Sequence, residues 1–140
     1  AVTSHGKVQL VSRNTEGTFI NMLCKCQVVV TSSGTIGSTI CWVDPVDNLQ
    51  FMPNRILCIN TSDITIYLPD TANIKDGYEI EFRHLWSNYV TIKSYNNLSN
   101  IVLNNAWYDN KTNQRTLDGS YIARYTWCAS RAFWVEEYHL

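Results

Sequence analysis

The chain has 140 residues, of which 45% are hydrophobic and 16% charged, and its formal net charge is −1. This composition provides a hydrophobic core and excludes a disordered chain, while the near-zero charge argues against nucleic-acid binding, which depends on Lys and Arg. No apolar run approaches the roughly 20 residues that cross a bilayer, so we expect no membrane insertion. We expect a single domain over residues 1–140, and a subdivision into N-terminal strands (1–50) and a second module (51–140) is the alternative.

Apolar and polar residues alternate with a period of two wherever a pattern is visible, which predicts antiparallel strands with one buried face. The first strands are expected over 7–13 and 18–30, and the second is long enough to contain a bulge. Shorter strands are expected over 39–43 and 49–59. Pro53 interrupts the last of these, because proline cannot donate a hydrogen bond to a β-ladder.

The second half of the chain shows the clearest alternation. A strand over 64–68 ends at Pro69, and the loop 70–76 has room for one helical turn capped by Asp70 or Thr71. The next strand begins after Gly77; its inward residues are Tyr78, Ile80 and Phe82, and its outward residues are Glu79, Glu81 and Arg83. Further strands are predicted near 90–92, 101–103, 121–128 and 132–138, with a polar loop over 109–114. The pattern predicts an all-β fold, an antiparallel sandwich or small jelly-roll-like barrel with little or no helix.

The cysteines and histidines form no recognisable site. The five cysteines include no CxxC pair, and their number is odd. Cys24 and Cys26 share one face of a predicted strand, but no second pair completes a zinc site. We therefore expect small core residues in a reducing environment, with no metal and no cofactor.

A search for catalytic groups favours a protein that is not an enzyme. The sequence has no G-x-S-x-G motif, and His84 is expected at the surface or in a turn. Glu79 and Glu81 would lie roughly 7 Å apart on one strand, a spacing that glycoside hydrolases use. The same spacing is typical of the water-facing side of an amphipathic strand, and we favour that interpretation.

Aromatic residues are abundant, with five Trp and eight Tyr, and several fall in predicted loops rich in Asn. Exposed rings beside amide or carboxylate groups suit sugars, because the ring stacks on the apolar sugar face while polar groups bind the hydroxyls. The alternative is that these rings fill the ends of a barrel. Trp127 and Trp134 are expected in the core or in a subunit contact. The candidate receptor-binding or glycan-binding residues are Trp86, Tyr89, Tyr95, Trp107, Tyr108 and Asp109.

The order of several short motifs resembles a module of bacteriophage tail fibres, tailspikes and related virion proteins. The motifs are ITIYLPD at 64–70, KDGYEIEF at 75–82, YVTIK at 89–93, LDGSYI at 117–122 and FWV at 133–135, and the resemblance covers roughly residues 55–138. It implies a homotrimeric virion-surface component, made in the host cytoplasm, that attaches to a host glycan or protein receptor. It supplies no binding residues.

The chain also departs from this family in having a long aromatic segment over 93–117, which we interpret as its own binding loop. Three alternatives stay open: a capsid-decoration or fibre-connector domain without binding activity, a glycan hydrolase of a tailspike, and a cellular lectin-like sandwich.

Overall fold

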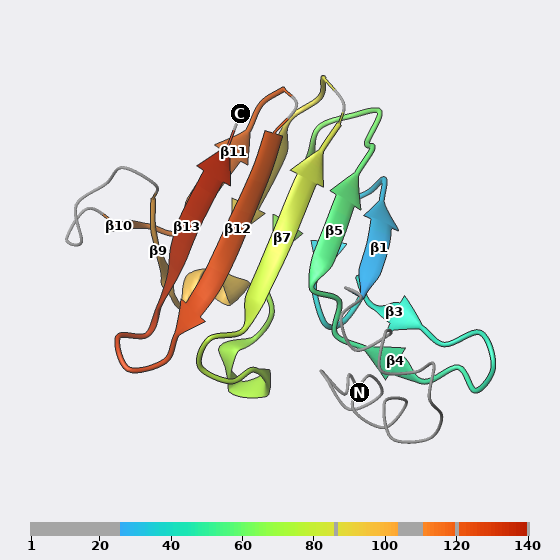
Figure 1. Cartoon of the computed structure of the whole chain (residues 1–140). Coiled ribbons are helices and arrows are strands. Elements are labelled where there is room, and N and C mark those ends of the chain that lie inside the picture. The colour runs from blue at the N-terminus through green and yellow to red at the C-terminus, as the bar shows by residue number, and fades with distance from the viewer. Residues whose placement is uncertain (1–25, 86, 104–110, 120, 140) are drawn as a thin grey trace.

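A computed structural model describes residues 26–85, 87–103, 111–119 and 121–139, and nearly all of its regular structure is β-strand. The strands form a seven-stranded sheet, a four-stranded sheet and a small two-stranded sheet (Figure 1). The larger sheet runs in the order β1 (Gln27–Val30), β5 (Arg55–Cys58), β7 (Glu79–His84), β12 (Tyr121–Cys128), β13 (Phe133–His139), β9 (Asn100–Val102) and β10 (Lys111–Thr112). The four-stranded sheet has the order β11 (Gln114–Leu117), β8 (Val90–Lys93), β6 (Ile64–Tyr67) and β2 (Gly34–Thr35), and β3 (Trp42–Val43) pairs with β4 (Gln50–Phe51).

The all-β class is confirmed, but the expected antiparallel pairing holds only in part. Among the described strands, five of the ten pairings are parallel. Four of these five pairings join three strand–turn–strand units that repeat along the chain, namely β1–β2, β5–β6 and β7–β8, and the fifth joins β13 to β9. Each unit passes from the larger sheet to the smaller one, so equivalent strands run in the same direction when the units stack. We call these three units the stacked rungs.

The register shows how closely the rungs match. Val30, Cys58 and His84 lie in one row across the larger sheet. Gly34, Ile66 and Ile92 lie in a similar row across the smaller sheet. Alternation along each strand therefore places the apolar side chains of successive rungs above one another between the two sheets. The described residues before position 50 share both sheets with residues from the second half of the chain.

The core lies between the two sheets and joins residues of the rungs to residues of the C-terminal strands. Trp127 and Trp134 are both buried there, with ring centroids 5.3 Å apart, which confirms the core alternative for this pair. The fully buried residues of the core cluster are Ile56, Cys58, Ile66, Leu68, Ile80, Phe82, Val90, Ile92, Ile101, Leu117, Ala123, Tyr125 and Trp134.

Local structure follows the turn chemistry of the sequence. Asp70 caps the short 3₁₀ helix η1 (Thr71–Asn73) by accepting a 3.1 Å hydrogen bond from the Ala72 amide, as predicted. Gly77 has a φ of +83°, which glycine adopts at little cost, and its amide donates to the Trp127 carbonyl before β7 begins.

Two predicted strands and one predicted loop fall wholly or partly outside the described residues. The strand over 7–13 lies outside the described residues, and only the end of the strand over 18–30 is described, as β1. The polar loop over 109–114 is wrong in its described part, because β10 and the start of β11 lie there. Both strands are short and lie at sheet edges, and β11 has one apolar residue, the buried Leu117, so the sequence shows little alternation there.

Candidate functional site

The candidate residues from the sequence are not gathered at one place. Tyr89 is exposed immediately before β8, whereas Tyr95 is half-buried in η2 (Tyr95–Asn97), after the other end of that strand. Six positions of extended chain place their backbones about 20 Å apart. The other four candidates, Trp86, Trp107, Tyr108 and Asp109, lie outside the described residues. A single ring surface that contains both Tyr89 and Tyr95 is therefore excluded.

The three turns that connect the two sheets within the stacked rungs offer a better-defined site around Tyr89. These turns lie at one end of the sandwich, where β1, β5 and β7 end (Figure 1). They comprise residues 31–33, 59–63 and 85–89, of which Trp86 is not described. We call their described residues the turn surface. Its exposed residues are Thr31, Ser32, Ser33, Thr61, Ser62, Asp63, Leu85, Ser87 and Tyr89.

Hydrogen bonds between turns hold Tyr89 in position. The Tyr89 amide donates to Asp63 Oδ1 at 3.0 Å, and the Tyr89 carbonyl accepts from the Ile64 amide at 3.1 Å and from Asn60 Nδ2 at 3.2 Å. Asn60 is completely buried, and its Nδ2 also donates to the Ser62 carbonyl at 2.8 Å. The backbone that carries the exposed Tyr89 ring is therefore fixed before any ligand arrives.

His84 lies beneath the turn surface. The prediction that it is exposed or in a turn is wrong. It is the last residue of β7, and its side chain is fully buried between the sheets. Burial lowers the pKa of His84, since desolvation penalises the charged ring, and the backbone of Gly119 and Asn88 and the Asp118 carboxylate offset only part of this effect. The backbone of Gly119 and Asn88 approaches the ring, although neither ring nitrogen meets strict hydrogen-bond geometry with a described group.

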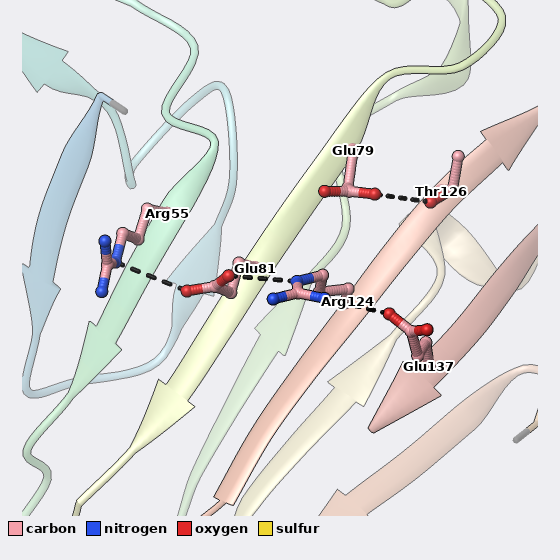
Figure 2. Close-up of polar contacts among 6 residues, drawn as sticks. All are labelled: Arg55, Glu79, Glu81, Arg124, Thr126 and Glu137. Atoms are coloured by element: carbon pink, nitrogen blue, oxygen red, sulfur yellow. Dashed lines mark hydrogen bonds and ion pairs between the residues drawn. The ribbon is translucent and has the colours of Figure 1, made fainter. Parts of the chain in front are cut away.

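The outer face of the larger sheet carries a row of alternating charges. Arg55, Glu81, Arg124 and Glu137 occupy matched register positions on β5, β7, β12 and β13. Figure 2 shows the three contacts that join them: Arg55 Nε to Glu81 Oε1 at 3.5 Å, Arg124 Nε to Glu81 Oε2 at 3.1 Å, and Arg124 Nη1 to Glu137 Oε1 at 3.0 Å. Hydrogen bonds to Glu81 and Glu137 raise the pKa of Arg124. We call these four residues the charged row.

The charged row changes the interpretation of the two carboxylates that could have supported glycoside hydrolysis. Both oxygens of Glu81 contact arginine, and its side chain is only 6% exposed. Glu79 accepts a hydrogen bond from Thr126 Oγ1 at 3.3 Å (Figure 2). The expectation that Glu81 faces water is wrong, because the long arginine side chains on the neighbouring strands cover it.

A buried carboxylate on the inner face was not found by sequence reasoning. Glu136 of β13 is buried, accepts a 2.7 Å hydrogen bond from the Tyr125 hydroxyl, and pairs with Arg115 Nε at 3.2 Å. Arg115 belongs to β11 of the smaller sheet, so this contact joins the two layers. Alternation along β13 places Glu136 on the same face as the buried Trp134 and Glu137 on the opposite face. The donors that make this burial possible come from other strands, so the local sequence does not show them.

The described cysteines behave as packing residues. Cys58 is completely buried, and burial raises the pKa of its thiol to about 12. Burial, together with the nearby Cys41, raises the pKa of Cys26 to about 11. Within the described residues, no three His, Cys, Asp or Glu side chains are grouped so that they could hold a metal ion.

Comparisons with protein families, with curated proteins and with solved structures found no match for this chain. Among the described residues, no helix is long and apolar enough to cross a membrane.

Proposed function

We propose that this chain is the tip domain of a viral fibre or spike, exposed on the virion surface, and that it attaches the virion to a host cell-surface receptor. The proposed receptor is a glycan, and the protein acts by binding it without catalysis. The single observation that carries the proposal is the turn surface, where polar side chains and one fixed, exposed tyrosine occur together at the end of the stacked rungs.

The chemistry of the turn surface suits a sugar. An exposed tyrosine ring offers an apolar face for stacking, and neighbouring hydroxyl and carboxylate groups accept or donate hydrogen bonds to sugar hydroxyls. Tyr89, Thr61, Ser62 and Asp63 supply these groups from two adjacent turns. Because the backbone of Tyr89 is already hydrogen-bonded, binding costs little additional ordering of this residue.

The stacked rungs also suit a fibre or spike. Each rung adds a strand to both sheets, so the units extend along one axis with continuous backbone hydrogen bonding, as in solenoid proteins. We propose that three copies assemble and that attachment is multivalent, since linked weak sites gain affinity through effective concentration. The resemblance of residues 55–138 to tail-fibre and tailspike modules favours the same role.

Binding to a glycan array and to candidate host cells tests the proposal with matched tyrosine variants. We expect Tyr89→Ala to weaken binding about fivefold or more, since the loss of one aromatic contact is worth about 1 kcal/mol or more. Tyr95→Ala, at the other end of β8, is the control and should bind like the wild type. Thermal unfolding of each variant verifies that the fold is retained.

Other outcomes of this experiment favour the rival functions. A folded wild-type protein that binds neither glycans nor cells would contradict the proposal and favour a connector or decoration domain. New reducing ends released from a polysaccharide would favour a hydrolase. Equal loss of binding in both tyrosine variants would contradict the placement of the site on the turn surface.

A further inference from the structure

The turn surface rests on a buried imidazole. His84 is the last residue of β7 and immediately precedes the turn that carries Tyr89. Its side chain is 0% exposed, and the turn that contains Asp118 and Gly119 covers the same end of the sandwich, because β12 pairs with β7 from His84 onward. Two turns therefore close over a group that gains a charge when it binds a proton.

The contacts of the turn depend on this closed arrangement. The backbone of Asn88 faces the His84 ring, and Asn88 Nδ2 donates to the Asn60 carbonyl at 3.2 Å. Asn60 in turn donates to the carbonyl of Tyr89. A shift of Asn88 away from the ring would therefore disturb the residue beside it, which is the exposed tyrosine of the turn surface.

The backbone of Gly119 and Asn88 and the Asp118 carboxylate favour a positive charge on the ring, but the cost of burial exceeds this support. Cys58 lies beside His84 in the register of β5, and its thiol is neutral because burial raises its pKa to about 12. Asp118, from the turn before β12, is the described carboxylate that faces the ring. From the smaller sheet, the residues at this end of the core are apolar: Ile64, Val90 and Leu117.

We propose that His84 regulates the turn surface by protonation: when the imidazole takes up a proton, the backbone of Asn88 and that of Asp118 and Gly119 move away from the ring, and Tyr89 loses its fixed position. In the closed state burial disfavours the charged ring more than its neighbours favour it, so protonation favours contact of the ring with water, and the covering turns are the part of the structure that separates it from water. The consequence for receptor binding rests on the proposed function, whereas the opening itself does not.

The direction of the pH effect follows from the lowered pKa of His84. The open state binds a proton more readily than the closed state, so the closed state has its full stability above about pH 6.5, the ordinary histidine value. This stability is lost as the pH falls from there through the lowered value of the closed state. Acidification should therefore weaken binding at the turn surface, and neutral pH should restore it.

Hydrogen exchange of the ligand-free protein tests the proposal directly. After correction for the intrinsic exchange rate, we expect the protection of the Tyr89 amide to fall about fivefold or more between pH 7.5 and pH 5.0, because the open state takes up a proton more readily than the closed state. The amide of Tyr125, in the middle of β12, should keep its protection. In His84→Gln, which cannot titrate, the protection of the Tyr89 amide should stay within twofold over the same range.

The carboxylates of Asp63 and Asp118 remain in His84→Gln, so any pH dependence that they cause persists in that variant. An equal loss of protection in wild type and variant would therefore overturn the proposal. If His84→Gln does not fold, an NMR titration of the wild-type ring replaces it, and the Tyr89 amide shift must follow the same midpoint as the His84 ring. Different midpoints would also overturn the proposal. If the protection of the Tyr89 amide depends on pH as expected but the protein binds no glycan, the result would contradict only the proposed function.

Discussion

The hydroxyl of Tyr125 donates a 2.7 Å hydrogen bond to the carboxylate of Glu136, and both side chains are buried between the two sheets. Arg115 of the smaller sheet reaches the same carboxylate oxygen at 3.2 Å. A buried carboxylate is costly unless donors surround it, so these contacts make the presence of Glu136 in the core tolerable.

The first prediction concerns this buried contact. Tyr125→Phe removes one donor from a buried carboxylate, and we expect it to lower the free energy of unfolding by about 1.5–3 kcal/mol. Urea unfolding measures the change. Thr126→Val, on the opposite face of the same strand, removes only the hydrogen bond to Glu79 and should cost less than about 1 kcal/mol. Equal losses in the two variants would contradict the special role of the buried carboxylate.

The second prediction compares two glutamates of the charged row. Glu81 contacts two arginines and has a side chain 6% exposed, whereas the Glu137 side chain is 56% exposed. Glu81→Gln should therefore lower the free energy of unfolding by about 1–2 kcal/mol, and Glu137→Gln by less than about 0.5 kcal/mol. The measurement is denaturant unfolding at low and high salt. A larger effect of the Glu137 variant would show that burial does not decide the strength of these contacts.

The third prediction tests the support of the turn surface. Asn60→Asp replaces an amide donor by a carboxylate oxygen that faces the carbonyls of Ser62 and Tyr89, and we expect a loss of about 2–4 kcal/mol. Asn88→Ala removes one half-buried hydrogen bond to the Asn60 carbonyl and should cost about 1 kcal/mol. Thermal unfolding monitored by circular dichroism gives both values. An Asn60→Asp protein as stable as the wild type would contradict the described turn network.

The fourth prediction concerns cysteine reactivity. The thiolate is the reactive form of cysteine, and burial raises the pKa of Cys58 to about 12. Iodoacetamide at pH 8 should therefore leave Cys58 unmodified in the folded protein and modify it in urea, with peptide mass spectrometry as the measurement. The partly exposed Cys128 serves as the internal reference and should react without urea. Modification of Cys58 at the same rate as Cys128 would contradict its burial.

The fifth prediction concerns the pH dependence of stability. Asp118 raises the pKa of His84, although burial lowers it more. Asp118→Asn removes the anionic neighbour, so the pKa of His84 in the folded protein should fall further. The loss of stability between pH 7.5 and pH 5.0 should then be larger than in the wild type, by up to about 1.4 kcal/mol for each unit of further decrease. Chemical denaturation at several pH values measures it, and a smaller loss in the variant would contradict the assignment.

Local features of the chain were predictable where one physical rule acted alone. Alternation placed the strands near 64–68, 121–128 and 132–138 close to their observed bounds, and it assigned Tyr78, Ile80 and Phe82 to the buried face. The cap at Asp70 followed from hydrogen-bond chemistry within a few residues. These features depend on neighbours in the chain, which the sequence displays directly.

Features that depend on distant partners were not predictable. Glu81 stands on the outward face of an amphipathic strand and Glu136 stands beside another glutamate, yet both are buried. The side chains that contact them come from other strands: Arg55, Arg124, Tyr125 and Arg115. His84 is buried for the same reason, as β12 and its preceding turn lie against the end of β7.

By itself, the sequence of this protein determined the class of the fold and the inward face of strands with clear alternation such as β7, because a period of two allows only one side of a strand to be buried. The tertiary structure alone decided the direction of pairing and the stacking of β1–β2, β5–β6 and β7–β8. It also brought Asn60, Asp63 and Tyr89 together. Alternation is identical in parallel and antiparallel strands, so only contacts between segments far apart in the chain distinguish the two arrangements.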